Sequence, residues 1–362
     1  MCQKRIYAFD FHLFKKLQSL HSHEAVLFSE DSFEKAKAEL LRSREYEIYD
    51  PSERLKTEWD NILAIPNPQI FPYDEASSRS MSFNWAYIPW ARTFIKIPDE
   101  NSFITLRTNR NLHKTTTHEI KTLQRKKVGI IGLSVGASIV MPIALERIAG
   151  EIRLADFDNL ELTNLNRIQG SIRQIGEKKA INTARQVSEL DPYLNIRVFP
   201  EGINDTNIEK FLLEDGKLDL VVEECDNGAI KLLTRMLCRK HRIPVVMETS
   251  DRGLLDLERF DLEPKRPLLH GMLREEDFKI DLTSEESREL LLKTFDLSKV
   301  SARGLASLHE IGKTLATWPQ LATDVIAGGA TAAMAIRMIL LNEAVVSGRR
   351  YVDIQSIIRR DP

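Results

Sequence analysis

The sequence has little cysteine, no excess of charge of either sign, and no apolar run at its start. Its 3 cysteines, Cys2, Cys225 and Cys238, form no CxxC pair, which excludes a disulfide framework and a zinc site of the CxxC type. The Lys and Arg residues number 51 and the Asp and Glu residues 53, so we expect no basic surface for nucleic acid or for an anionic membrane. We therefore expect small molecules and proteins as partners, and a reducing, cytoplasmic location.

Long hydrophobic runs are also scarce, with one exception at residues 321–341. Asp324 and Arg337 interrupt this segment, and either side chain would be costly in hydrocarbon. We expect a buried helix, or a pair of helices separated at Gly328 and Gly329, in place of a membrane span.

What is present is the composition of a globular protein, with 43% hydrophobic and 29% charged residues. Residues 1–105 form an expected N-terminal accessory region of mixed α/β character, whose aromatic residues we assign to core or interdomain packing. From residue 127 onward, short apolar strands alternate with amphipathic helices, as in a parallel sheet with crossover helices. The predicted strands are 128–131, 152–155, 196–199, 218–223 and 244–248, and the predicted helices between them are 138–148, 180–190 and 229–239. The expected fold is α/β: a doubly wound, Rossmann-like, mainly parallel sheet within a domain of residues 106–362 that closes with a helical segment.

The first predicted strand runs into a degenerate glycine loop, Gly132-Leu-Ser134-Val-Gly136-Ala-Ser. Glycine at 132 permits a tight turn, and small residues after it let backbone amides approach a phosphate at a helix N-terminus. Asp156 ends the second strand 24 residues after Gly132, close to the spacing at which a carboxylate reaches a ribose hydroxyl. This pattern alone fits NAD, FAD or ATP, or a turn that holds no ligand.

Polar residues beyond the second strand narrow the choice. They stand in three runs, Asp156-Phe-Asp158, Thr163-Asn164-Leu-Asn-Arg167 and Gly176-Glu-Lys-Lys179. Arginine and lysine neutralise the charge of a triphosphate, which a simple dinucleotide fingerprint does not require. Asp226 follows the fourth strand, faces the same crevice, and is placed to hold a magnesium ion.

The segment 128–249 resembles the adenylating domain of the ThiF/MoeB/HesA superfamily, relatives of the ubiquitin-activating enzymes. Members share a glycine loop, a D-x-D…S-N-L-x-R run, a G-x-x-K element and a D-N pair after a later strand, and all four occur here in that order. The resemblance implies an enzyme in which a carboxylate, often the C-terminus of a β-grasp protein, attacks the α-phosphorus of ATP. The products are an acyl adenylate and pyrophosphate.

The resemblance also implies roles for single residues. The nucleotide-binding positions are Gly132, Ser134, Gly136, Asp156, Asp158, Asn164, Arg167, Lys179 and Asn227. Asp156 would bind the ribose, Asn164 and Arg167 the phosphates, and Lys179 the triphosphate. Asp226 would hold Mg²⁺, and Arg110 would reach the site of a second subunit across a homodimer interface. Arg110, Arg167, Lys179 and Asp226 are therefore the expected catalytic residues.

Several positions depart from the family pattern. Ser134, Val135 and Ala137 stand where glycines are usual, Thr163 replaces a serine, and Lys231 replaces an arginine that often follows the D-N pair. No cysteine has the electropositive setting of a reactive thiolate. We therefore expect adenylation without zinc and without a protein thioester.

Two other functions stay open. A catalytically silent nucleotide-binding subunit would fit the glycine-poor loop. An NAD(P)-dependent oxidoreductase would bind its cofactor through Asp156, but that function would not explain Arg167, Lys179 and Asp226.

The leading interpretation implies ATP, a carboxylate substrate and a second copy of the chain as partners. The run Thr317-Trp-Pro-Gln is similar to a segment of ThiF-like proteins that are fused to a flavin domain. This similarity implies a separate redox partner as a further expected partner of the chain. Asp251 and Arg252, near the mouth of the crevice, are candidates for substrate contact.

Overall fold

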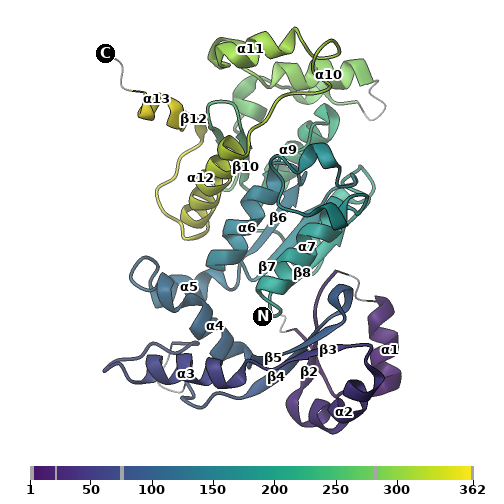
Figure 1. Cartoon of the computed structure of the whole chain (residues 1–362). Coiled ribbons are helices and arrows are strands. Elements are labelled where there is room, and N and C mark those ends of the chain that lie inside the picture. Colours follow the sequence, from purple (N-terminus) through teal and green to yellow (C-terminus); the bar gives the residue numbers. More distant parts are fainter. Residues whose placement is uncertain (1–3, 21–22, 74–76, 280–283, 360–362) are drawn as a thin grey trace. The chain divides into compact units, whose positions relative to one another are not determined.

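The computed structural model describes residues 4–20, 23–73, 77–279 and 284–359 (Figure 1). The chain divides into two compact units. Unit 1 comprises the described residues up to Arg125 together with Ala144–Glu151 and Ala184–Ile196, and unit 2 comprises Lys126–Ile143, Ile152–Thr183 and the described residues from Arg197 onward. Two short segments of the predicted Rossmann-like region therefore cluster with the N-terminal part of the chain.

Unit 1 contains a five-stranded mixed sheet in the order β1-β2-β4-β5-β3. Its strands are β1 (Ile6–Tyr7), β2 (Val26–Ser29), β3 (Glu47–Tyr49), β4 (Phe83–Ile88) and β5 (Thr93–Pro98). Its helices are α1 (Phe11–Leu20), α2 (Glu30–Ser43), α3 (Ser52–Leu63), α4 (Glu100–Thr108) and α5 (Thr117–Leu123), with short 3₁₀ turns η1 (Pro89–Ala91) and η2 (Asn109–Asn111).

Aromatic side chains fill one face of this sheet. Phe28, Trp85 and Phe94 are fully buried together with rings from α1 and α2, because alternate residues of a strand point to the same face. Leu27, which alternates with Phe28, packs on the opposite face beside Tyr193. The assignment of the N-terminal aromatic residues to core packing is confirmed.

The second sheet has seven strands in the order β12-β11-β10-β9-β6-β7-β8. They are β6 (Lys127–Ile131), β7 (Glu151–Ala155), β8 (Asn195–Phe199), β9 (Leu220–Glu223), β10 (Val245–Thr249), β11 (Leu254–Glu258) and β12 (Gly348–Tyr351). β9 runs parallel to β6 and β10, whereas β11 is antiparallel to both β10 and β12. The order β8-β7-β6-β9-β10 is that of a doubly wound sheet, so the predicted Rossmann-like fold is confirmed, with an antiparallel extension at one edge.

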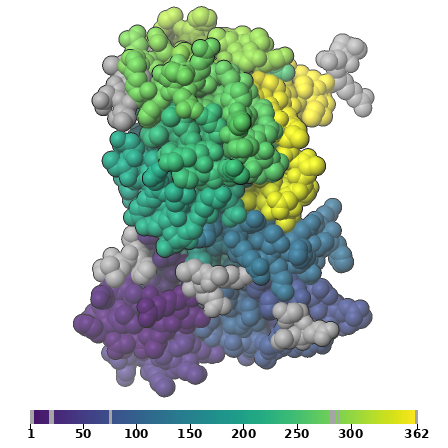
Figure 2. All heavy atoms as spheres, turned by 180° about the vertical axis from the view of Figure 1, so that it is seen from behind, coloured from purple at the N-terminus to yellow at the C-terminus, as the bar shows by residue number. Residues whose placement is uncertain are grey.

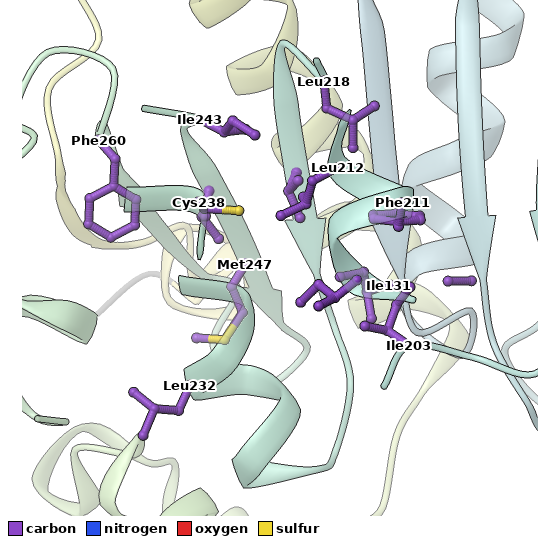
Figure 3. Close-up of a cluster of buried hydrophobic side chains, with 14 of the residues drawn as sticks. Ile131, Ile203, Phe211, Leu212, Leu218, Leu232, Cys238, Ile243, Met247 and Phe260 are labelled. Carbon is purple, nitrogen blue, oxygen red and sulfur yellow. The ribbon is translucent and has the colours of Figure 1, made fainter. Parts of the chain in front are cut away.

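Helices of the Rossmann-like region connect and cover these strands. They are α6 (Gly136–Glu146), α7 (Lys179–Leu190), α8 (Ile208–Leu213), α9 (Gly228–His241), α10 (Ser284–Lys293), α11 (Ala302–Leu308), α12 (Ala322–Leu340) and α13 (Ile354–Ile358). In unit 2, Phe211 of α8 and Leu232 of α9 pack with Ile131 and Met247 of the sheet (Figure 3). A doubly wound sheet binds its ligands beyond the carboxyl ends of its strands, at the point where the strand order reverses. Here that point lies between β6 and β9.

The C-terminal part of the chain differs in detail from the prediction. The sequence is charged after Asp251 and predicts a loop-rich stretch as far as Ser301, but this stretch contains α10 and three 3₁₀ turns, η5 (Leu268–Gly271), η6 (Glu275–Asp277) and η7 (Leu297–Lys299). The sequence predicts a terminal strand over residues 350–354, whereas β12 comprises Gly348–Tyr351. Local sequence patterns locate element ends poorly, because tertiary packing decides them.

α12 is one continuous helix that runs through Gly328 and Gly329. It packs on β10 and β11, and the absence of a side chain at Gly329 lets it approach Ser138 of α6. Its length and hydropathy alone are those of a membrane span, but half of the apolar window is buried inside the structure. Figure 2 shows the C-terminal segment, in yellow, beside the green middle part of the chain. The expectation of a buried helix is confirmed, and that of a break at the glycines is wrong.

Candidate functional site

The turn between β6 and α6 requires glycine at its first position. Gly132 has φ +86°, a conformation that side chains disfavour. A Cβ there would lie 2.7 Å from the carbonyl carbon of Glu224. The backbone amide of Gly132 donates to the Ala155 carbonyl at 2.9 Å, so the turn is held against the ends of β7 and β9.

Asp156 fixes the turn from the end of β7. Its carboxylate accepts hydrogen bonds from the Leu133 amide at 2.6 Å and from the Asp158 amide at 2.7 Å. Burial raises the pKa of Asp156, while these two bonds and Lys179 act against that rise. The carboxylate that is predicted to bind a ribose is therefore already oriented by the backbone.

Arg167 reaches the glycine loop through Ser134. One terminal nitrogen donates to Ser134 Oγ at 3.1 Å, and the other donates to Asn166 Oδ1 at 2.8 Å. Its Nε is buried and has no partner among the described residues. Burial lowers the pKa of Arg167, and nearby Asp226 raises it. An arginine with an unsatisfied donor beside a phosphate-type loop is suited to receive an anionic oxygen.

Lys179, the first residue of α7, is also turned toward this region. Its Nζ lies 2.9 Å from Asp158 Oδ2 and its backbone amide donates to the Asp158 carbonyl at 2.9 Å. The lysine side chain is 8% exposed. The pair with Asp158 holds the ammonium group in place. The Asp158 side chain is half exposed, so water screens its charge and the ammonium group is only partly neutralised.

Asp226 and Asn227 follow β9. Asp226 is exposed at the surface, yet the surrounding protein displaces enough water to raise its pKa, with Lys231 acting against the rise. Asn227 caps α9, because its Oδ1 accepts from the amides of Ala229 and Ile230. The nucleotide-binding role of Asn227 stays a prediction, and the contacts give it a structural one.

The structure brings several of the predicted residues of unit 2 together. Electrostatic coupling links Asp226 to both Arg167 and Lys179. Asn164 is buried, and its Oδ1 accepts from the Glu161 amide at 3.0 Å, so the contacts given for it are local. Arg110 is an exposed residue of η2 in unit 1. The roles of Asn164 and Arg110 stay predictions.

A buried network of charges next to Asp226 was not predicted. Glu223 accepts from Lys231 at 2.8 Å, from the Cys225 amide at 2.9 Å, and from Arg235. Arg235 also donates to Glu258 at 2.6 Å. Burial acts to raise the pKa of Glu223, but the two cations outweigh it and lower the pKa to about 2. Lys231 is thus committed to Glu223 and does not add to the phosphate-facing charge.

The remaining candidates take structural roles. Burial raises the pKa of the thiols of Cys225 and Cys238, and Cys238 is enclosed in the core shown in Figure 3. Cys2 lies outside the described residues. Asp251 accepts from the amide and hydroxyl of Ser301, and Arg252 pairs with Asp353 at 2.9 Å. Substrate contact by Asp251 and Arg252 stays a prediction.

Comparison with known proteins relates this arrangement to one family. Residues 106–346 match the model of the ThiF family. Uncharacterized protein MT1398 of Mycobacterium tuberculosis (strain CDC 1551 / Oshkosh) is 41% identical over 301 residues, which are 83% of this chain and 41% of that protein. Ubiquitin-like modifier-activating enzyme 5 of Caenorhabditis elegans is 28% identical over 131 residues, 34% of this chain and 31% of that protein. The chain therefore spans about two fifths of the mycobacterial relative and about a third of the other.

Among solved structures, the E. coli tRNA N6-threonylcarbamoyladenosine dehydratase TcdA in complex with ATP is similar to this chain, with a TM-score of 0.48 and 16% identity. The match covers 65% of this chain and 94% of that chain.

Proposed function

The chain belongs to the ThiF family, and from this premise we propose that it is an adenylating enzyme that activates a carboxylate with ATP. The superfamily resemblance expected from the four motifs is confirmed by the family match. The observation that carries the proposal is the arginine at the glycine loop. Arg167 has a buried Nε without a partner among the described residues, and its guanidinium group donates to the Ser134 hydroxyl at the glycine loop; we infer that a phosphate oxygen would replace this hydroxyl as the acceptor.

The chemistry asks mainly for positioning and charge neutralisation. A carboxylate is already ionised at neutral pH, so no general base is required for its attack on the α-phosphorus. Arg167 and Lys179 would neutralise the developing charge on the phosphates. The bond from the α-phosphorus to the leaving pyrophosphate breaks as the carboxylate–phosphorus bond forms.

Magnesium fits this site as a companion of the triphosphate. The described residues hold no group of three or more metal-ligating side chains. Mg²⁺ is commonly held by one or two carboxylates, with phosphate oxygens and water completing its shell. Asp226 is the carboxylate that we propose for that purpose, and Mg²⁺ bound there would neutralise phosphate charge.

A direct transfer from the adenylate is favoured over a cysteine relay. The thiols of Cys225 and Cys238 both have raised pKa values because they are buried, and a thiol rather than a thiolate is a poor nucleophile. We further propose a cytoplasmic homodimer in which Arg110 acts in trans on the partner's nucleotide.

The decisive experiment measures ATP binding and turnover separately. Titration calorimetry with ATP and Mg²⁺ gives affinity, and exchange of labelled pyrophosphate into ATP in the presence of carboxylates and β-grasp proteins gives adenylation. Arg167→Ala should lower affinity at least 10-fold, whereas Arg173→Ala, an exposed arginine nearby, serves as the matched control and should not.

Other outcomes would assign a different function. ATP binding without exchange by any carboxylate tried would identify a silent subunit. Binding of NADH with no binding of ATP would refute the proposal. For Arg110, an Arg110→Ala chain mixed with an Arg167→Ala chain should regain partial exchange, and a mixture that stays inactive would contradict action in trans.

A further inference from the structure

Two side chains orient the guanidinium group of Arg167, and one of them belongs to the neighbouring residue, Asn166. One terminal nitrogen donates to Ser134 Oγ at 3.1 Å, and the other donates to Asn166 Oδ1 at 2.8 Å. The second nitrogen also donates to the Thr163 carbonyl at 3.3 Å, which is a longer contact. Once a phosphate oxygen replaces the Ser134 hydroxyl, Asn166 supplies the shorter of the two contacts that still orient the arginine.

The Asn166 side chain is exposed, but both ends of its amide are engaged. Its Nδ2 donates to the Gln320 carbonyl at 2.8 Å, while its Oδ1 accepts from Arg167. An amide carries an acceptor and two donors on one group. Turning it over would place the NH₂ group against the guanidinium group and the oxygen against the Gln320 carbonyl, so both contacts would become repulsive. The amide is therefore held in one orientation, with its oxygen toward the arginine.

The Gln320 carbonyl is itself held in place by the residues on both sides of it. Pro319, directly before it, has a fixed φ angle. Trp318 packs against Gly304, where a Cβ would lie 3.1 Å from the tryptophan ring. On the other side, α12 begins two residues after Gln320. This run of the sequence therefore presents a fixed carbonyl group to Asn166.

The start of α12 is also tied to the helix that follows the glycine loop. Ser138, in the first turn of α6, donates from Oγ to the Val325 carbonyl of α12 at 2.9 Å. Gly329 lets the two helices approach here, because a Cβ at this position would lie 2.5 Å from the Ser138 carbonyl oxygen. Val325 is fully buried. The glycine loop and Arg167 are therefore both tied to the same helix end.

From these contacts we propose that Asn166 is a positioning residue, which holds the Arg167 guanidinium group toward the glycine loop and ties it to the start of α12 through the Gln320 carbonyl. An arginine side chain loses rotamer freedom when it binds a ligand. Here part of that loss is already incurred in the ligand-free protein, so a phosphate group binds more tightly.

The inference rests on the proposed function, because it requires Arg167 to receive a phosphate oxygen. Asn166 acts through this arginine, so its effect falls on the binding of phosphate groups and not on the binding of a nucleoside. This difference separates a positioning role from general support of the fold.

Calorimetry with inorganic tripolyphosphate, ATP and adenosine measures that difference. Asn166→Ala should weaken the binding of tripolyphosphate and of ATP by about 5-fold or more, the value of one hydrogen bond, and leave the binding of adenosine unchanged. Asn159→Ala is the matched control, since Asn159 is an exposed asparagine in the same segment between β7 and α7, and it should change none of the three affinities. Asn166→Gln keeps a donor and an acceptor on an exposed side chain, so it should bind tripolyphosphate more tightly than Asn166→Ala.

A double-mutant cycle tests whether Asn166 acts through the arginine. In an Arg167→Ala chain, Asn166→Ala should cause no further loss of tripolyphosphate affinity, because the group that it positions is absent. A further loss as large as the loss in the wild type would overturn the proposal.

A measurement without any ligand keeps this inference separate from the proposed function. In protein made with ¹⁵N-labelled arginine, NMR reports how fast the Arg167 guanidinium group rotates about its Nε–Cζ bond, and Arg167→Ala identifies the signal. The rotation should be faster in Asn166→Ala than in the wild type, and equal rates would overturn the proposal. If the wild type binds neither ATP nor tripolyphosphate, the proposed function fails, and the rotation rates alone decide the role of Asn166.

Discussion

Replacing Glu248 by glutamine should stabilise the protein at neutral and alkaline pH. The pKa of Glu248 is raised from an ordinary value of 4.5 to about 8 by burial and by Asp324. Below pH 4.5 the folded and unfolded chains both hold the proton, so the acid costs nothing. Between pH 4.5 and 8 the unfolded chain ionises while the folded chain keeps its proton, and stability is lost as the pH rises. Above pH 8 the cost is constant.

The magnitude follows from the two pKa values. Each pKa unit between folded and unfolded states is worth about 1.4 kcal/mol, so the cost is about 3 kcal/mol at pH 7 and about 5 kcal/mol above pH 8. Glutamine at 248 carries no charge, but its amide would be buried without a partner, which costs about 1–3 kcal/mol. The net gain for Glu248→Gln is thus about 0–2 kcal/mol at pH 7, rising by about 1.4 kcal/mol toward pH 8.5.

Urea denaturation of the wild type and of Glu248→Gln at pH 5, 7 and 8.5 measures this difference. We expect the gap in the free energy of unfolding to widen in favour of the variant with pH, while the exposed Glu343→Gln shows no trend. A variant that is less stable than the wild type at pH 8.5 would refute the reasoning, since it would mean that the Glu248 charge is compensated inside the protein.

Three more perturbations test other parts of the site. Arg235→Met should lower the free energy of unfolding by about 3–5 kcal/mol, because Glu223 and Glu258 would lose their shared cation. Urea denaturation measures this loss, and a loss well below that range would contradict the prediction. Gly132→Ala should cost about 2 kcal/mol or more and abolish ATP binding, because φ is +86° and the methyl group meets backbone; calorimetry with unchanged affinity would contradict this. Ser134→Gly should raise ATP affinity several-fold by freeing the arginine that the serine holds, and an unchanged or weaker Kd would mean that the serine does not compete with phosphate.

Sequence periodicity was sufficient to predict the doubly wound sheet. Strands such as residues 128–131 and 152–155 are short apolar runs that match β6 and β7 within one residue at each end, because buried parallel strands are apolar on both faces. The continuous course of α12 could not be predicted, since Gly328 and Gly329 read locally as a break. Tertiary packing explains these two glycines, because side chains at their positions would overlap Glu248 and Ser138.

The candidate site was predictable where motif spacing encodes it. Asp156 and Lys179 stand at family spacings, and the structure places both at the strand ends beside the glycine loop. Glu248 and Asp324 are 76 positions apart, and nothing in either local sequence relates them. Only the packing of α12 on β10 brings them together. The pairing of Lys231 with Glu223 was not predicted either, because it depends on how α9 packs against β9, the strand in which Glu223 lies eight positions earlier.

The near-zero net charge of the chain hides a separation of charge within unit 2. Arg167 and Lys179 lie on the β7 side of the glycine loop, whereas Glu224, Glu248 and Asp324 lie on the β10 side. Burial and Asp324 raise the pKa of Glu248 to about 8, so at neutral pH this acid holds its proton, and a triphosphate at the loop would be attracted from the β7 side without being repelled by Glu248. ATP affinity should therefore fall as the pH rises through 8, because Glu248 then becomes charged. Titrating ATP at pH 7 and at pH 8.5 with the wild type and with Glu248→Gln measures this effect, and the same change of affinity in both chains would show that the charge of Glu248 does not act on the loop.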